Sequence, residues 1–291
     1  MLEALPHPLL VPDDGNFKVK DAATAPPKSA PDKKDLKKRL DELTEELDEL
    51  QRRFYAYDRR ALLLIFQAMD AAGKDSTIRA VMSAVDPAGC HVHAFKKPSQ
   101  DELQHDFLWR TTLRLPSKGM IGIFNRSYYE EVLAVRVHPE YLEAQHLPEV
   151  PHNGDIWEQR LKSIRDHERH LARNGTVIIK FWLNISREEQ RQRFLSRLQE
   201  AEKHWKFSEQ DVEERKHWDE YMHAYEAAIN ATARTWAPWY AIPADDKPYM
   251  RVCVAEIIID TLKRMNLDYP SIDTETLQRF KVLEKQLENE N

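Results

Sequence analysis

The chain has 291 residues, of which 42% are hydrophobic and 32% charged, and its formal net charge is -6. This composition is typical of a soluble globular enzyme, and the acidic balance excludes a surface that attracts polyanions by its overall charge. The only two cysteines exclude a disulfide framework, and no apolar run is long enough to span a membrane. We therefore expect a cytoplasmic protein without membrane or nucleic-acid partners, in which local groups of Lys and Arg hold any anionic ligand.

The first 31 residues are rich in Pro, Ala and Asp, and they predict an irregular arm. From Asp32, leucines recur at spacings of three and four residues, which predicts an amphipathic helix over residues 32–57. This leucine seam fits two roles: a helix that covers the protein's own sheet, or a coiled-coil contact with another subunit. The seam consists of Leu36, Leu40, Leu43, Leu47 and Leu50.

Short, continuous apolar runs follow, and helical stretches separate them. Runs without polar alternation are typical of strands buried on both faces, and intervening helices imply a parallel sheet. The predicted strands cover residues 61–67, 91–95, 120–124, 176–183 and 240–242. The sequence therefore predicts one α/β domain over residues 32–270, followed by a helical tail over residues 271–291.

The first predicted strand runs directly into AMDAAGKDST, residues 68–77. A phosphate-binding loop of the form G-x-x-x-x-G-K-[ST] surrounds an anion with backbone N–H groups and a lysine at the start of a helix. Gly73 and Lys74 keep this pattern, whereas Ala68 and Asp75 stand where Gly and Ser or Thr are usual. The order of strand, turn and helix favours phosphate binding over simple helix capping by Asp75. The predicted phosphate contacts are Ala71, Ala72, Gly73, Lys74, Asp75, Ser76 and Thr77.

Two carboxylates of this loop, Asp70 and Asp75, predict a Mg²⁺ site, since a hydroxyl at position 75 would normally bind the metal. The strand at 120–124 ends in Asn125, whose carbonyl oxygen could bind the metal or one of its waters. Arg126 follows at the carboxyl end of that strand, where open α/β sheets bind ligands. Its planar guanidinium favours a contact to phosphate over a structural ion pair.

The stretch SREEQRQRFLSRL, residues 186–198, begins with a capping box of Ser186 and Glu189 and therefore predicts a helix. Arg193 and Arg197 lie four residues apart, on one side of this helix. Two interpretations are open: a solvated face whose arginines pair with nearby glutamates, or a cationic lid that closes over phosphates. Basic and aromatic residues just beyond the helix favour the lid.

Together, these motifs resemble the second family of polyphosphate kinases, over roughly residues 35–270. The resemblance implies a P-loop kinase fold related to thymidylate kinases, which is a three-layer α/β/α sandwich with a central parallel sheet and a helical lid, here about residues 186–212. It also implies a reversible phosphoryl transfer between inorganic polyphosphate and nucleotides that requires Mg²⁺ or Mn²⁺. The sequences that carry it are AMDAAGKDSTIRAVMSAVDPAGCHVHAFKKPS, IGIFNRSYYEEVLAVRVHPE, RFLSRLQEAEKHWKFSEQDVEERKHWDEY and APWYAIPADDKPYMRVCVAEII.

The resemblance assigns roles to single residues. It implies that Asp70 holds metal and orients the acceptor phosphate, and that Lys74 binds the phosphoryl group in transfer. Many members have Asp where this chain has Asn125, and Glu130 is then a candidate to complete the metal site. The implied catalytic residues are Asp70, Lys74, Arg126 and Arg193, and the implied further phosphate ligands are Lys96, Lys97, Arg136 and Arg197.

The form FNRSYYEEVL resembles the subgroup that phosphorylates both nucleoside monophosphates and diphosphates. We expect adenine nucleotides as substrates, with guanine nucleotides as further candidates, and a homo-oligomer, either a dimer or a tetramer. Two other functions remain open. An ordinary monophosphate kinase would use ATP and would be expected to have Ser or Thr at position 75. A regulator that only binds nucleotide or polyphosphate would give no product.

Overall fold

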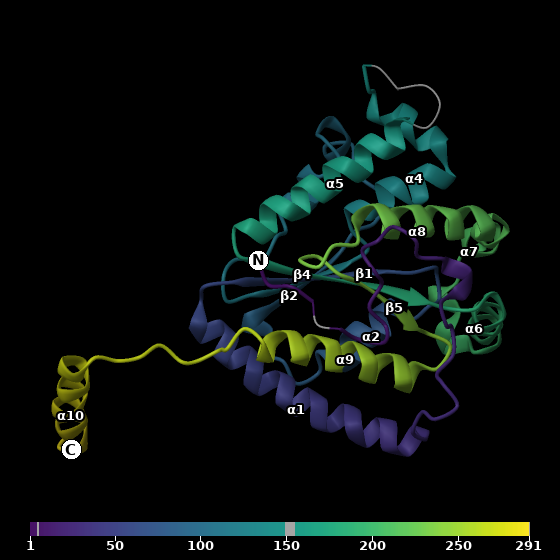
Figure 1. Ribbon diagram of the computed structural model, residues 1–291. Coiled ribbons are helices and arrows are strands. Elements are labelled where there is room, and N and C mark those ends of the chain that lie inside the picture. The colour runs from purple at the N-terminus through teal and green to yellow at the C-terminus, as the bar shows by residue number, and fades with distance from the viewer. Residues whose placement is uncertain (5, 149–154, 291) are drawn as a thin grey trace.

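A five-stranded parallel sheet in the order β2-β3-β1-β4-β5 forms the centre of the molecule (Figure 1). The computed structural model describes residues 1–4, 6–148 and 155–290. Each predicted strand is present, and its ends differ by at most one residue from the prediction. The strands are β1 (Ala61–Gln67), β2 (Cys90–Ala94), β3 (Ile121–Asn125), β4 (Thr176–Asn184) and β5 (Trp239–Pro243).

Burial differs between the middle and one edge of the sheet. Every residue of β1 and β3 is buried, as their continuous apolar sequences predict. β2 is different, because its edge position leaves Val92 51% exposed and His91 exposed as well. The prediction that this run is buried on both faces was therefore wrong.

Helices cover both faces of the sheet (Figure 1). On one face lies α9 (Lys247–Lys263), with α1 (Lys33–Tyr57) packed along it and α2 (Lys74–Val81) in contact with it. On the other face lie α5 (Asp155–Arg173) and α8 (Trp218–Thr232), which pack against each other. The predicted three-layer α/β/α sandwich is confirmed.

The leucine seam of α1 faces the protein's own core. Asp32 caps the helix by accepting hydrogen bonds from the backbone N–H groups of Lys34 and Asp35. Leu43 and Leu47 are fully buried where α1 packs along α9. The first of the two roles considered for this helix, covering its own subunit, thus accounts for the seam.

The N-terminal arm closes the outer edge of β5. Leu10 forms an antiparallel bridge with Tyr240, and the N–H of Val11 donates to the carbonyl of Trp239 over 2.9 Å. Val11 is buried in this position. Since an open strand edge invites pairing with other chains, the arm protects β5 from such contacts.

A buried ion pair links the layers behind the loop that carries Arg126. Lys180 on β4 donates to Glu168 on α5 over 2.6 Å, and neither side chain is exposed. Burial lowers the pKa of Lys180, and Glu168 opposes this effect. Glu168 also accepts hydrogen bonds from the hydroxyls of Tyr128 and Tyr129, over 3.0 and 2.8 Å. The pair therefore anchors the turn that follows Arg126.

The other helices connect these layers or follow them. The helix predicted after Ser186 is present, and it forms α6. At the end of the chain, α10 lies away from the sheet and buries none of its residues (Figure 1). No helix in the described part of the chain is long and apolar enough to cross a membrane. The remaining α-helices described are α3 (Trp109–Thr112), α4 (Ala134–Val137), α6 (Arg187–Gln199), α7 (Glu209–Glu214) and α10 (Thr274–Glu288).

Candidate active site

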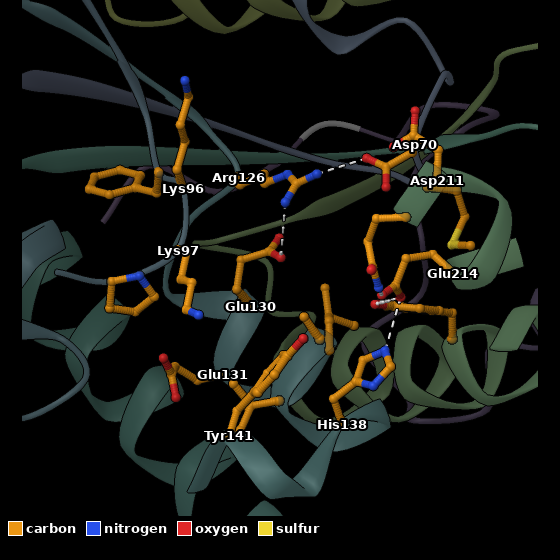
Figure 2. Close-up of a pocket in the computed structure, with 18 of the residues that line it drawn as sticks. Asp70, Lys96, Lys97, Arg126, Glu130, Glu131, His138, Tyr141, Asp211 and Glu214 are labelled. Atoms are coloured by element: carbon orange, nitrogen blue, oxygen red, sulfur yellow. Dashed lines mark hydrogen bonds and ion pairs between the residues drawn. The ribbon is translucent and has the colours of Figure 1, made fainter. Parts of the chain in front are cut away.

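The candidate site lies at the carboxyl end of the sheet, where the loops after β1, β2 and β3 meet. In parallel sheets these strand ends share one edge, and ligands bind in the crevice outside it. The loop 68–73 leads from β1 into α2, and Lys96 and Lys97 follow β2. Arg126 follows β3, so residues predicted from separate motifs lie around one space (Figure 2).

The loop after β1 has the backbone shape of an anion-binding turn. Ala71 and Gly73 have φ values of 60° and 108°, in the left-handed region. The φ of Gly73 favours glycine at this position, and a Cβ there would also approach Met250 Cε to 3.2 Å, which the flexible Met side chain would have to accommodate. Because α2 begins at Lys74, its first N–H groups have no carbonyl partner within the helix and can bind an anion.

Lys74 is folded into this loop. Its Nζ donates to the carbonyl of Ala68 over 2.8 Å and lies 3.4 Å from that of Met69. Burial lowers the pKa of Lys74, and Arg126 lowers it further, while Asp70 is the first of the carboxylates that raise it. A bound phosphate would act in the same direction as these carboxylates and favour the charged lysine.

The four predicted metal ligands fall into two pairs. In the first pair, the amide of Asn125 donates to the carboxylate of Asp75, which joins the end of β3 to the first turn of α2. The second pair, Asp70 and Glu130, surrounds Arg126 instead (Figure 2).

Arg126 is held in place by that second pair. Its Nη2 donates to Asp70 Oδ1 over 2.7 Å, and its Nη1 lies 4.0 Å from Glu130 Oε2. Glu130, followed by Asp70, raises the pKa of Arg126 against the effect of burial. The residue itself has a φ of 64°, and its N–H donates to the carbonyl of Phe66. The guanidinium is thus fixed between two carboxylates, where it can face a third anion.

The donor set fits Mg²⁺ that is shared with a phosphate. Among the residues described, no three His, Cys, Asp or Glu side chains form a cluster that could hold a metal ion. Mg²⁺ usually keeps several waters and uses one or two carboxylates together with substrate phosphates. The carboxylate of Asp75 offers such an oxygen ligand beside the loop. Asn125 faces it with its amide N–H, so the carbonyl oxygen of Asn125 would join the same site once the amide turns over.

Two cavities meet at the Asp70–Arg126 pair, and both residues line each of them. The first, the cationic cavity, has a volume of about 580 Å³ and adjoins Lys74 and Asp75. Asp211 also lines it and lies 3.1 Å from Arg197, and burial raises the pKa of this carboxyl. Further basic residues in its wall are Arg79, Lys96, Lys97, Arg193, Arg197, Lys203 and Lys247.

The second, the apolar cavity, has a volume of about 510 Å³. At its far end His138 lies 3.0 Å from Glu214, and Tyr141 is beside it (Figure 2). The hydroxyl of Tyr221 donates to the same Glu214 over 2.8 Å. Apolar and aromatic side chains form much of its wall, namely Phe95, Leu103, Leu133, Val135, Tyr141 and Tyr225.

Most predicted site residues line one or both cavities, but Ala72 and Thr77, which are buried, and Arg136 do not. Lys96 and Lys97 line both cavities, and Arg197 lines the cationic one. Arg136, predicted as a further phosphate ligand, is half-buried in α4 and lines neither cavity. Arg193 lines the cationic cavity, but it donates to backbone carbonyls of the loop.

Sequence reasoning missed residues from α7 and α8 that complete the cavities. Asp211 lines both cavities, and Glu214, Tyr221 and Tyr225 line the apolar one. They lie in or next to the quoted stretch SEQDVEERKHWDEY, but no spacing in that stretch indicates a ligand. Its high density of charged and aromatic residues was the only available signal.

Comparisons with a family model and with known proteins agree on one family for this chain. The family model described as Polyphosphate kinase 2 matches residues 30–270. An ADP-polyphosphate phosphotransferase of Rhodopseudomonas palustris is 55% identical over 227 residues, which cover 78% of each chain. An AMP/ADP-polyphosphate phosphotransferase of Meiothermus ruber is 45% identical over 232 residues, which cover 80% of this chain and 83% of that protein.

A solved structure supports the same relationship. The crystal structure of polyphosphate kinase 2 from Arthrobacter aurescens superposes with a TM-score of 0.86 and 37% sequence identity. The match covers 97% of this chain and 99% of that one. The similarity therefore extends over nearly the whole molecule.

Proposed function

Since the chain belongs to the polyphosphate kinase 2 family, we propose that it transfers a phosphoryl group from inorganic polyphosphate to AMP and ADP, reversibly, forming ADP and ATP. The observation that carries this proposal is the pair of cavities that meet at one phosphate loop, one cationic and one largely apolar. A phosphotransferase needs both substrates at the same phosphoryl group, and this arrangement provides a place for each. The names of two relatives, one for ADP and one for AMP and ADP, support both acceptors.

The cationic cavity is the proposed site of polyphosphate. The protein as a whole is acidic, with a net charge of -6, so a long polyanion can bind only where basic residues are concentrated. Lys96, Arg197 and Lys247 come from different elements but share this wall. Burial lowers the pKa of Lys247, and Arg193 is the first of the like charges that add to this effect. A bound polyanion would relieve that repulsion.

The apolar cavity is the proposed site of the nucleoside. An aromatic side chain such as Tyr141 can stack on a base, and the apolar wall can exclude water around it. The phosphates of the nucleotide would then point to the shared wall, where Arg126 and Lys97 lie. Adenine nucleotides are the proposed substrates, with guanine nucleotides as further candidates.

Catalysis in this proposal depends on positioning and on neutralising charge. Phosphoryl transfer spreads negative charge over the equatorial oxygens, and fixed cations stabilise it. Lys74 and Arg126 supply these cations, and Asp70 orients Arg126 toward the phosphates. Mg²⁺ or Mn²⁺, held by Asp75 and Asn125, would supply further positive charge to the phosphate oxygens. Closure of the lid, residues 186–212, would exclude water that could hydrolyse the donor.

The donor test separates the proposed function from its alternatives. The purified protein is incubated with Mg²⁺, AMP and polyphosphate, and nucleotides are separated by chromatography. We expect ADP first and ATP afterwards, without any added triphosphate. An ATP-dependent monophosphate kinase would give no product here and would react only when ATP replaces polyphosphate, while a binding protein would give none in either mixture. Product from ADP but none from AMP would contradict only the dual-acceptor part.

Three accompanying properties are proposed with the function. We propose a homo-oligomer, either a dimer or a tetramer, which light scattering of the purified protein would measure. We also propose a cytoplasmic location, which the two unpaired cysteines, Cys90 and Cys253, support because a reducing compartment keeps thiols free. The third is the use of Mg²⁺ or Mn²⁺, which activity after chelation and re-addition of each metal would test.

A further inference from the structure

The N–H groups of Arg193 donate hydrogen bonds to other groups of the protein. Its Nη1 donates to the carbonyls of Ala71 and Ala72 over 3.1 and 2.7 Å, and its Nη2 to those of Ala244 and Asp245 over 2.6 and 3.1 Å. A guanidinium has five N–H donors, and the remaining one, on Nε, donates to Glu189 over 2.8 Å. With its side chain 9% exposed, Arg193 has every donor group engaged.

Gln190, one turn earlier on α6, holds the preceding peptide. Its Nε2 donates to the carbonyl of Asp70 over 2.9 Å, and its Oε1 accepts a hydrogen bond from Arg215. Gln190 is buried and has no net charge, and both ends of its amide are engaged by protein groups, so it adds no charge that could attract phosphate. It can act on the loop only through geometry.

Together these contacts engage every carbonyl from Ala68 to Ala72. Lys74 binds the carbonyls of residues 68 and 69 from one side, and α6 binds those of residues 70, 71 and 72 from the other. A peptide whose carbonyl is fixed outward presents its N–H in the opposite direction. The N–H of Ala72 already donates to the carbonyl of Met69 over 3.3 Å. The contacts from α6 to the carbonyls of Asp70 and Ala72 therefore matter most, because they turn the N–H groups of Ala71 and Gly73 away from α6, where these groups can converge on an anion.

This loop has a specific need for such support. Ala71 adopts a left-handed φ of 60°, which is unfavourable for a residue with a Cβ. The usual glycine at position 68 is also absent. A loop with alanines at these positions does not gain its shape from glycine, so neighbouring groups must impose it.

We propose that Arg193 and Gln190 are positioning residues that clamp the phosphate loop in its anion-binding shape, and that neither is a direct phosphate ligand. Arg193 joins the loop after β1 to the segment after β5, since its carbonyl partners come from both. Arg197, four residues further along α6, lines the cationic cavity and pairs with a side chain, Asp211, that a phosphate can replace. The inner half of α6 thus shapes the loop, and the outer half faces the substrate.

Arg193→Lys is the variant that separates shape from charge. Lysine keeps the positive charge, but its single ammonium cannot reach four carbonyls on two segments, whereas Arg193→Met removes the charge as well. If Arg193 clamps the loop, Arg193→Lys and Arg193→Met should speed amide exchange in the loop and lower kcat to a similar extent. For a phosphate ligand, lysine should retain much of the function. Gln190→Met removes the neighbouring contact without any change in charge, and Arg197→Lys with Arg197→Met form the matched control pair on the same helix.

The first measurement is hydrogen–deuterium exchange of the unliganded protein, followed by mass spectrometry. We expect amide exchange in peptides covering residues 68–77 to be on the order of tenfold faster in Arg193→Lys, Arg193→Met and Gln190→Met. Exchange in α5, on the opposite face of the sheet, and loop exchange in the Arg197 variants should match the wild-type protein. Unchanged exchange of the loop in the three clamp variants would overturn the proposal. The outcome of this exchange experiment does not depend on the proposed function.

The second measurement is turnover with polyphosphate and ADP, and it rests on the proposed function. We expect kcat to fall by about 100-fold in both Arg193 variants, since a small displacement of the loop misplaces the reacting groups. The KM for ADP should stay within about twofold, and Arg193→Met combined with Gln190→Met should lose less than the product of the single effects. Retention of most kcat by Arg193→Lys would identify Arg193 as a phosphate ligand instead. A silent wild-type protein would refute the proposed function while leaving the exchange result to decide the clamp.

Discussion

The cationic and apolar cavities share one wall but differ in what surrounds it. Both contain Asp70, Arg126, Lys96 and Lys97. Beyond that wall, the cationic cavity adds basic residues from α2, α6 and α9, and the apolar cavity adds apolar side chains together with several carboxylates, among them Glu130, Glu131, Glu140 and Glu214. The basic residues beyond the shared wall are thus concentrated on the side of the cationic cavity, whereas the apolar cavity combines Arg110 and Arg215 with more carboxylates.

On the proposed assignment of the two cavities, this difference would let an acidic protein select a highly charged donor. Attraction by the whole surface would draw polyanions everywhere, whereas a local concentration of basic residues directs them to one side of the reacting groups. On the other side, carboxylates and aromatic surface favour a small ligand that brings its own apolar part. Variants of the shared wall should affect both substrates, and variants beyond it should affect one.

The largest effect is expected at the loop where the two cavities meet. Lys74→Ala should lower kcat by about 10³-fold, because a fixed cation at the transferring phosphoryl group is lost. Both KM values should change far less than kcat, and thermal unfolding should shift by only a few degrees, since the lost contacts are two carbonyl hydrogen bonds. Steady-state kinetics and calorimetry would measure this.

Two other results for Lys74→Ala would change how the two cavities are compared. If only the KM for polyphosphate rose, Lys74 would belong to the cationic cavity alone and not to the shared site. A fall of more than about 10 °C in the unfolding temperature would indicate a structural lysine, because a drop of that size exceeds the loss of two hydrogen bonds.

The next largest effect concerns the metal. Asp75→Asn should raise the Mg²⁺ concentration for half-maximal activity by about 10- to 100-fold, because the only carboxylate of the Asp75–Asn125 pair is removed. Asn125→Asp, which adds a second carboxylate at the same place, should lower it. Magnesium titrations of the two variants would measure these opposite shifts in the Mg²⁺ requirement. Parallel shifts in both would move the metal site to the Asp70–Glu130 pair.

The smallest effects should separate the two cavities most clearly. Arg197→Met should raise the KM for polyphosphate by about tenfold, as expected for one charge-assisted contact, and should leave the KM for ADP unchanged. Tyr141→Ala should raise the KM for ADP by about fivefold through lost stacking, and should leave the KM for polyphosphate unchanged. Tyr141 is 43% exposed, so its removal should not disturb folding.

The same two variants can contradict the assignment of the cavities. Measuring both KM values in each variant gives four results, of which two should change. If Arg197→Met instead raised the KM for ADP and Tyr141→Ala raised the KM for polyphosphate, the two proposed sites would have to be swapped. Equal effects on both substrates would mean that the two cavities act as one.

The sequence predicted the fold well because the sheet is mostly interior. The strands at 61–67 and 120–124 are buried on every residue, and a run that is apolar apart from the terminal Gln67 fits such a place. The exposure of β2 could not be predicted, because it follows from the order of strands in the sheet. That order is set by contacts between distant segments and leaves no periodic signal in a strand of five residues.

Prediction of the site was less complete, for a related reason. The phosphate loop and Arg126 lie within short contiguous motifs, so their local geometry could be inferred. Glu214 and Tyr225 reach the apolar cavity from α7 and α8, which are distant in sequence from the phosphate loop, and no local pattern encodes that placement. The contacts of Arg193 depend on the direction of carbonyl groups in another segment, and the same residue spacing would equally fit a phosphate ligand.

The buried Lys180–Glu168 pair restricts how this protein can change over generations. Replacement of either residue alone would leave one charge in the interior without its partner, which is typically worse than removing both. Single-step replacements at these positions would therefore be removed by selection, and an apolar substitute for the pair would require two changes at nearly the same time. Few single substitutions are therefore tolerated in the pair that anchors the turn after Arg126. Tyr141, which is exposed at the far end of the apolar cavity, can instead be replaced by single substitutions. On the proposed assignment of the apolar cavity to the nucleoside, acceptor preference could thus diverge along a lineage while the phosphate loop and Arg126 stay the same.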